Sequence, residues 1–149
     1  MRVTRQSAKW AVGLALTVGF FAVGCARMES RMGTPSATTP TLSGAEEVPP
    51  VNTQASGVSR ISVIGDKTVI GGIETSNLNA TAAHIHQGPR GQNGPVIITL
   101  VKSGENGWSV PANTMLTSAQ FDAYRAGNLY VNVHSAAYPN GEIRAQLKP

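Results

Sequence analysis

Residues 82–95 read AAHIHQGPRGQNGP and run directly into VIITL at residues 96–100. Two apolar runs flank a loop rich in Gly and Asn, which predicts strands at 82–87 and 95–101 joined by a turn. Side chains two residues apart on a strand share one face. His84 and His86 should therefore stand side by side, while Ile85 points to the opposite face. The only other histidine, His134, also lies in a strand-like run.

The clearest alternation of apolar and polar side chains occurs in residues 129–134 and 142–147, which a turn at 138–141 connects. This pattern predicts two half-buried strands in the wall of a sandwich or barrel, each with one apolar and one polar face. The apolar set is Leu129, Val131, Val133, Ile143, Ala145 and Leu147, and the polar set is Tyr130, Asn132, His134, Glu142, Arg144 and Gln146.

Earlier in the chain, residues 59–64 and 68–78 read as a hairpin around an Asp-Lys turn, with a bulge at Gly71 and Gly72. One helix is predicted at 117–126. Thr117 can cap its first turn together with Gln120, and Gly127 follows its end. The expected fold class is all-β, a sandwich or barrel with one short helix.

Length and composition agree with a single domain of this kind. The chain has 149 residues, of which 41% are hydrophobic and 13% charged, and its 16 glycines and 9 prolines favour short strands and turns. The formal charge is +4, but three basic residues lie in the first ten. Without them, nine of the 12 basic residues face eight acidic ones, a charge of +1. We therefore expect no nucleic-acid partner.

The N-terminus has the layout of a secretory signal. Residues 1–9 carry three positive charges, and residues 10–24 form an uncharged, mostly apolar run that is short for a membrane span of about 20 residues. The run ends at Cys25, the only cysteine of the chain. Small residues before a cysteine resemble a bacterial lipobox, in which the cysteine is lipidated; the alternative is an ordinary signal with a chance cysteine.

The lipobox interpretation divides the chain into a signal peptide at 1–24, the lipidated Cys25 with a Ser-, Thr- and Pro-rich tether at 25–41, and a domain at 42–149. It implies an exported protein held at a membrane by its acyl chains. Ala26 stands where an aspartate typically marks inner-membrane retention, so the resemblance implies the outer membrane if the source is Gram-negative. The domain would then lie in the periplasm or at the cell surface.

Three motifs in order resemble the CHRD (chordin-type) domain. They are LSGAEEVPP at 42–50, the His84–His86 stretch with Asn-Gly-Pro at 93–95, and residues 127–144, GNLYVNVHSAAYPNGEIR. The resemblance covers about residues 42–147. It implies an all-β Greek-key or immunoglobulin-like domain whose bacterial function is poorly defined. Fold similarity alone does not transfer the growth-factor antagonism of animal chordin.

The histidines are the candidate metal ligands. A His-x-His pair on a strand plus one distant histidine offers three nitrogens and leaves an open coordination position, a donor set suited to copper or zinc. The spacing also resembles the copper-binding strand of copper-zinc superoxide dismutases, although this chain lacks that family's further histidines and its disulfide. The alternative is that His84, His86 and His134 only bond the loops around them. Glu142 could orient the His134 ring or pair with Arg144, and we expect the ion pair.

No motif indicates an enzyme. There is no Gly-x-Ser-x-Gly elbow, and the loop at 88–94 leads into a strand rather than a helix that would bind phosphate. Two hypotheses therefore stand. The first is a membrane-anchored interaction module that presents loops 88–94 and 135–141 to a protein partner. The second is an exported copper- or zinc-binding protein. The metal content of the purified protein separates them.

Overall fold

The computed structural model describes residues 39–149, which fall within one compact unit, Ser36–Pro149. The signal peptide at 1–24, Cys25 and most of the tether at 25–41 lie outside the described residues, so those predictions are not tested here. Within residues 39–149, no helix is long and apolar enough to cross a membrane.

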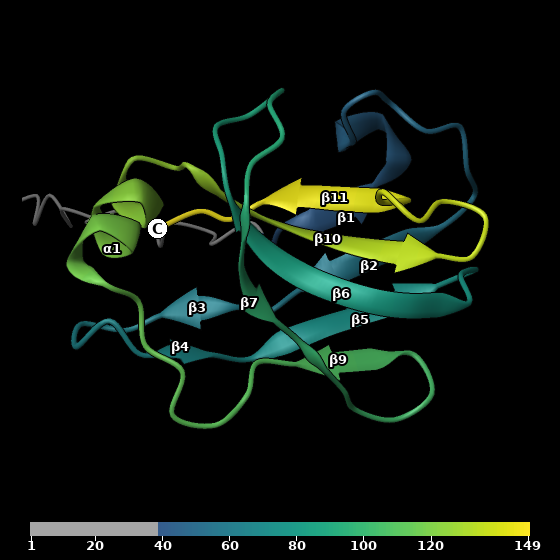
Figure 1. The fold of residues 1–149 in the computed structure, drawn as a ribbon. Helices are drawn as coiled ribbons and strands as arrows, with labels where there is room; N and C mark the ends of the chain where they lie inside the picture. The colour runs from purple at the N-terminus through teal and green to yellow at the C-terminus, as the bar shows by residue number, and fades with distance from the viewer. Residues whose placement is uncertain (1–38) are drawn as a thin grey trace, which may run out of the picture. The chain divides into compact units, whose positions relative to one another are not determined.

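The described chain is mostly β-structure with one short α-helix, as expected from the sequence (Figure 1). Its strands are β1 (Thr41–Ser43), β2 (Ser56–Ser59), β3 (Ser62–Val63), β4 (Val69–Ile70), β5 (Gly72–Ser76), β6 (Ala80–Gln87), β7 (Val96–Thr99), β8 (Val101–Lys102), β9 (Gly107–Ser109), β10 (Leu129–Ser135) and β11 (Ile143–Gln146). A 3-10 turn, η1 (Gly44–Glu46), follows β1, and the helix is α1 (Ser118–Arg125).

Nine of the strands form one antiparallel, nearly closed, barrel-like sheet in the order β7-β6-β10-β11-β1-β2-β5-β9-β8. The two end strands, β7 and β8, are separated in sequence only by Leu100, which is buried. The segment from Val96 to Lys102 therefore pairs with β6 at one edge of the sheet and with β9 at the other. Figure 1 shows this segment crossing in front of the sheet between β6 and β9.

The predicted hairpin at 59–64 and 68–78 exists but is divided between two sheets. β3 and β4 pair around the Asp-Lys turn as a separate two-stranded sheet, whereas β2 and β5 pair within the large one. Gly71, with φ of +96°, separates β4 from β5. A side chain there would meet the Arg60 carbonyl oxygen at 2.0 Å, so this position requires glycine.

The helix begins and ends as its capping residues predict. The Thr117 hydroxyl accepts a hydrogen bond from the Gln120 amide, and the Gln120 side chain accepts one from the Thr117 amide. Gly127 follows with φ of +73°. Tyr124 is buried, and its hydroxyl donates to the Lys148 carbonyl, which attaches the helix to the C-terminal segment.

The apolar side chains of β10 and β11 form the centre of the core. Val131, Val133 and Ile143 are fully buried. Val133 lies opposite Ile143 on β11, and Val131 lies between Ala145 on β11 and Ile85 on β6. The alternation read from the sequence is therefore confirmed on this face. The buried apolar residues around them include Leu42, Ile73, Ala83, Ile85, Leu100, Trp108, Leu129, Ala145 and Leu147.

The opposite face of these strands differs from the prediction. We call it the polar face and define it by His84, His86, Tyr130, Asn132, His134, Arg144 and Gln146. The strands were expected to be half-buried, yet Arg144 is 1% exposed and Asn132 is 3% exposed. Loop 88–94 makes hydrogen bonds across Arg144 and Gln146, and Glu47 of the η1 segment contacts Gly141. Both faces of the strand pair are thus buried.

Candidate metal centre

The antiparallel register of β6 and β10 brings the three histidines to one side of the sheet. His84 on β6 lies opposite Asn132 on β10, and His86 lies opposite Tyr130. Directly opposite residues of an antiparallel pair share a face. His134 is two residues beyond Asn132 on β10 and therefore projects from the same face. The local two-residue period and the strand register together place all three imidazoles on the polar face.

The rings converge, which a shared metal ion would require. His84 Nδ1 lies 2.8 Å from His134 Nε2. Each residue offers one nitrogen such that the three atoms all lie within 4.8 Å of one another. The ring centroids are 4.7 Å apart for His84 and His134, 5.8 Å for His84 and His86, and 6.5 Å for His86 and His134. With metal–nitrogen bonds of about 2 Å, one metal ion could not contact three rings separated by more than about 10 Å. The three rings here are much closer together than that.

Backbone carbonyls fix which nitrogen of two rings carries the proton. His86 Nδ1 lies 2.9 Å from the Gly94 carbonyl oxygen, and His134 Nδ1 lies 3.0 Å from that of Pro139. A carbonyl only accepts, so each Nδ1 must donate its proton. In the neutral rings Nε2 then holds the lone pair. His86 Nε2 is buried and has no hydrogen-bond partner among the described residues.

Gly94 is held from both sides. Its carbonyl accepts from His86, and its amide donates to the Tyr130 hydroxyl at 3.1 Å. A Cβ at this position would lie 1.8 Å from the Gln87 carbonyl oxygen, so only glycine fits. The Asn-Gly-Pro motif at 93–95 therefore has a specific role: it brings a carbonyl close enough to orient the His86 ring.

The environment favours the neutral form of all three imidazoles. Burial lowers the pKa of His84, and the neighbouring His134 and His86 rings lower it further. Burial also lowers the pKa of His86 and of His134, although the hydrogen bonds to Gly94 and Pro139 oppose the shift. Neutral imidazole is the form that ligates a metal ion.

A stack of three side chains supports the site. The Tyr130 ring lies parallel to the His86 ring with centroids 4.7 Å apart, and the Arg144 guanidinium carbon lies 3.4 Å from the Tyr130 centroid. Arg144 also donates to the carbonyls of Pro89 and Gln92 at 3.2 and 3.0 Å, and to the Asn93 side chain. Arg144 thereby connects the stack to the loop that carries Gly94.

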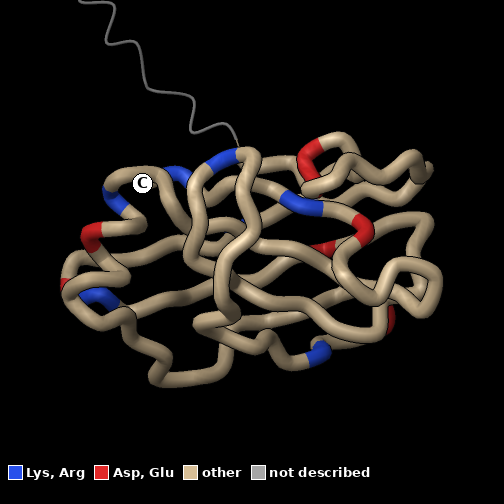
Figure 2. The backbone as a smooth tube through the Cα atoms, turned by 45° about the horizontal axis from the view of Figure 1, so that its top comes forward, with Lys and Arg blue, Asp and Glu red and all other residues tan. Residues whose placement is uncertain are grey.

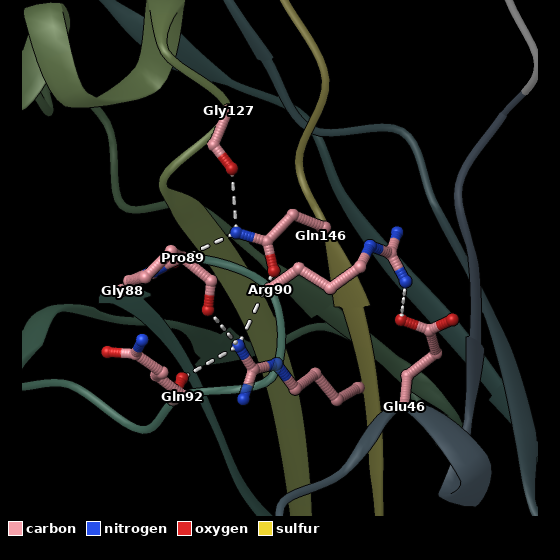
Figure 3. A network of polar contacts seen from close by, with 8 residues as sticks. Glu46, Gly88, Pro89, Arg90, Gln92, Gly127 and Gln146 are labelled. Carbon is pink, nitrogen blue, oxygen red and sulfur yellow. Dashed lines mark hydrogen bonds and ion pairs between the residues drawn. The ribbon is translucent and has the colours of Figure 1, made fainter.

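The rest of loop 88–94 is attached in the same way. The Gln146 amide donates to the carbonyls of Gly88 and Gly127 at 2.9 and 2.8 Å (Figure 3). Arg90, on the outer side of the loop, forms an ion pair with Glu46 of η1. The base of the loop is therefore held to β11, while the residues around Gly91 are exposed.

Glu47 and Asn132 form a second buried polar group on this face. A Cβ at Gly141 would lie 2.6 Å from Glu47 Oε1 and 2.8 Å from Asn132 Nδ2, so both side chains pack against that glycine. Glu47 Oε1 and Asn132 Oδ1 have no hydrogen-bond partner among the described residues. Burial raises the pKa of Glu47 to about 7, against the opposing positive charge of Arg144.

Glu142 does not have either of the partners considered for it. Its carboxylate accepts hydrogen bonds from the Thr53 hydroxyl at 2.6 Å and from the Ser135 hydroxyl. Neither of the two ion pairs among residues 39–149 involves Glu142, so the expected pair with Arg144 is wrong. His134 is oriented by the Pro139 carbonyl instead. The reason is that Glu142 lies just before β11, and the segment that contains Thr53 packs next to it there.

Comparison with known protein families identifies the domain. The family model described as CHRD domain matches residues 38–147, and the chain belongs to this family. No curated protein and no solved structure matches the chain significantly. The three histidines, Gly94, Tyr130 and Arg144 all lie inside the matched span.

Sequence reasoning did not identify Glu47, Asn132, Tyr130 and Arg144 as parts of the site. For three of them a signal was present, because the two-residue period that places His134 on the polar face also places Tyr130, Asn132 and, across the hairpin, Arg144 there. Glu47 gave no such signal. It reaches the polar face only because the segment after β1 folds over it.

Proposed function

We propose that this CHRD-domain protein is an exported metal-binding protein that holds one copper or zinc ion through His84, His86 and His134. The observation that carries the proposal is the convergence of three imidazoles, each offering one nitrogen, with these nitrogens all within 4.8 Å of one another. Imidazole is the commonest protein ligand for these metals.

The residues present fit such an ion. His86 and His134 would ligate through Nε2, since each Nδ1 donates to a backbone carbonyl, the orientation that metal-ligating histidines usually show. In the metal-free structure His84 Nδ1 donates a hydrogen bond to His134 Nε2 at 2.8 Å, because His134 Nδ1 already donates to the Pro139 carbonyl. A metal ion would replace this hydrogen bond: His84 would ligate through Nδ1 and carry its proton on Nε2. The metal would also occupy the lone pair of His86 Nε2, which is buried and unpaired within residues 39–149. Three protein ligands leave a position for water or a small ligand.

The decisive experiment is metal titration of the purified chain after treatment with a chelator. We expect one equivalent of Cu²⁺ or Zn²⁺ to bind. His86→Ala and His134→Ala should each weaken binding by more than the roughly 10–100-fold typical of losing an outer-shell partner. Glu105→Ala, which removes an exposed carboxylate, is the control and should bind as the wild type does. Equal affinity in all four proteins, or no binding by the wild type, would contradict the proposal.

The affinity should also depend on pH in a defined direction. Protonation of an imidazole competes with the metal, and burial lowers all three histidine pKa values below the usual 6.5. Binding should therefore persist at pH 6.5 and weaken only as the pH falls further, which isothermal titration calorimetry over pH 5–8 measures. Affinity already falling between pH 8 and pH 7 would identify other groups as the ligands.

A second candidate function is recognition of a protein partner through loops 88–94 and 135–141. A groove of about 260 Å³ runs between the segment Glu47–Val51 and the residues Ala137–Gly141. The exposed tip of loop 88–94 rests on a base anchored to Arg144 and Gln146, so a partner could bind the tip without disturbing the core.

Lys and Arg residues are interleaved with Asp and Glu residues along the described chain (Figure 2). We therefore continue to expect no nucleic-acid partner.

We further propose that Cys25 carries the lipid that anchors the protein. Membership of the CHRD family is consistent with export, and the apolar run ending at Cys25 supports a lipoprotein signal. The domain would then lie at a membrane surface, the outer membrane in a Gram-negative source. Two or more acyl chains give stable attachment where one does not.

A further inference from the structure

The small sheet formed by β3 and β4 exposes apolar side chains on its outer face. An isolated bridge joins the residue before β4 to Met115, which extends this sheet by one residue. Val69 and Leu116 point inward and are 3% and 5% exposed. Neighbouring residues on a strand point to opposite faces, and Ile64, Ile70 and Met115 on the outer face are 45%, 47% and 60% exposed. We call these three residues the apolar patch.

The patch is contiguous. The Ile64 amide donates to the Thr68 carbonyl at 2.9 Å, and Thr68 forms the bridge with Met115. Ile64 and Met115 therefore flank Thr68 across the sheet, and Ile70 follows Thr68 by two residues on the same face. Three of the five exposed large apolar side chains in residues 39–149 belong to this patch. Single exposed apolar residues are normal, but adjacent ones on one face indicate an interaction surface.

The patch lies at the end of the domain where the N-terminal segment joins the barrel. The Pro40 carbonyl accepts a hydrogen bond from the Ser59 amide at 2.9 Å, and Ser59 is three residues before β3. Lys67, in the turn between β3 and β4, donates to Ser118 at the start of α1 at 3.0 Å. Figure 1 shows β3, β4 and α1 at one end of the domain and the turn between β10 and β11 at the other.

The length of chain between Cys25 and the barrel keeps this end near a lipid attached to Cys25. Pro40 is 15 residues after Cys25, and a segment of that length spans at most about 50 Å even when fully extended. Attachment through such a segment makes docking an intramolecular event, with an effective concentration in roughly the millimolar range. A patch too small to bind a membrane alone can therefore hold the anchored domain against it.

Charges at this end nearly balance, so they do not select a strongly charged partner. Asp66 and Lys67 lie in the turn between β3 and β4, and Asp122 and Arg125 lie on α1. Lys148, whose carbonyl accepts from the α1 residue Tyr124, adds one positive charge. A contact made here should depend mainly on apolar side chains and little on salt.

From these observations we infer that the apolar patch docks on a phospholipid bilayer, with Ile64, Ile70 and Met115 inserted at the boundary between headgroups and acyl chains. This inference rests on the proposed lipid anchor at Cys25 and specifies which face of the domain lies against the membrane. The turn between β10 and β11, at the other end of the domain, and the groove beside it would then remain open to a partner.

Fluorescent labels on the full, lipidated chain in phosphatidylcholine vesicles test the inference. Cys25 is the only cysteine and lipidation blocks its thiol, so Ile70→Cys and Met115→Cys each provide one site for a polarity-sensitive dye. We expect a blue shift of both labels and their quenching by nitroxides on the lipid acyl chains, at low and at high salt. Ala137→Cys, at an exposed position in the β10–β11 turn, is the control and should show neither effect. Either patch label suffices if the other variant does not fold.

A charge placed in the patch gives a second readout. Adding Met115→Glu to the Ile70→Cys protein should reduce the quenching of its label, because a carboxylate is costly to insert among acyl chains. Unquenched patch labels on a vesicle-bound chain, quenching that disappears at high salt, or equal quenching of the Ala137→Cys label would overturn the docking and leave the anchor standing. A wild-type chain that does not bind vesicles and whose Cys25 reacts with the dye would refute the anchor, and this inference with it.

Discussion

His86 is the residue on which the site depends most. Its Nδ1 donates to the Gly94 carbonyl, its ring stacks on Tyr130, and its Nε2 is buried with no partner in residues 39–149. An unpaired buried acceptor costs free energy unless something bonds to it. A metal ion at the three histidines would satisfy this acceptor, and the Asn132 side chain, which also influences the His86 pKa, is the alternative partner within the protein.

Glu47 leads to a prediction at the same scale. Its pKa is raised to about 7 in the folded protein from an ordinary 4.5, so the folded state binds the proton more tightly than the unfolded chain. Stability should therefore fall as the pH rises from about 4.5 to 7, by about 3 kcal/mol once the carboxyl is ionised. Glu47→Gln should remove this loss. We expect it to be more stable than the wild type at pH 8 and little different at pH 4.

Urea unfolding at both pH values measures the effect. Glu46→Gln is the matched control, since it removes the neighbouring carboxylate, which forms a surface ion pair with Arg90. Its effect should stay within about 1 kcal/mol. A Glu47→Gln variant that is no more stable than the wild type at pH 8 would show that the carboxyl is not held in an unfavourable environment.

At the scale of elements, β10 and β11 combine two roles. One face supplies the fully buried Val131, Val133 and Ile143 to the core, and the other supplies Tyr130 and Arg144 to the site. The strand alternation predicted the core face correctly. It did not predict burial of the polar face, because alternation reports which side chains share a face and not what covers that face.

The core role is tested by truncation. Val131→Ala should lower the free energy of unfolding by about 1–4 kcal/mol, because the side chain is fully buried between Ile85 and Ala145. The matched control is Val101→Ala on β8, where the side chain is 54% exposed, and its effect should stay within about 0.5 kcal/mol. Chemical denaturation of the two variants compares them directly; equal losses would argue against the core position of β10.

At the scale of the whole molecule, the barrel is closed by one short segment. Residues 96–102 pair with β6 and then with β9, so neither edge of the nine-stranded sheet is left as a long unpaired strand. Exposed edges invite association with other chains. The same closure holds β6, and with it His84 and His86, between β7 and β10.

The anchoring of the molecule is tested through Cys25. Because the apolar run ends at this residue, Cys25→Ser should release into the soluble fraction a protein that otherwise fractionates with membranes. Immunoblots of the two fractions and mass spectrometry of the mature N-terminus measure this. Unchanged fractionation of the variant, together with an unlipidated wild-type N-terminus, would favour the ordinary signal peptide.

Local patterns were sufficient to predict several features. The all-β class, the core residues of β10 and β11, the limits of α1 and the shared face of His84 and His86 depend on residues within a few positions of one another, where periodicity and capping act. Long-range contacts established the rest. Glu142 bonds Thr53 across 89 residues of sequence, and Arg144 bonds Gln92 across 52. Contacts of that range arise from how the loops fold over the barrel, and no local period encodes them. The burial of the polar face, the position of Glu47 and the spacing of the three donor nitrogens therefore emerged only in the folded chain.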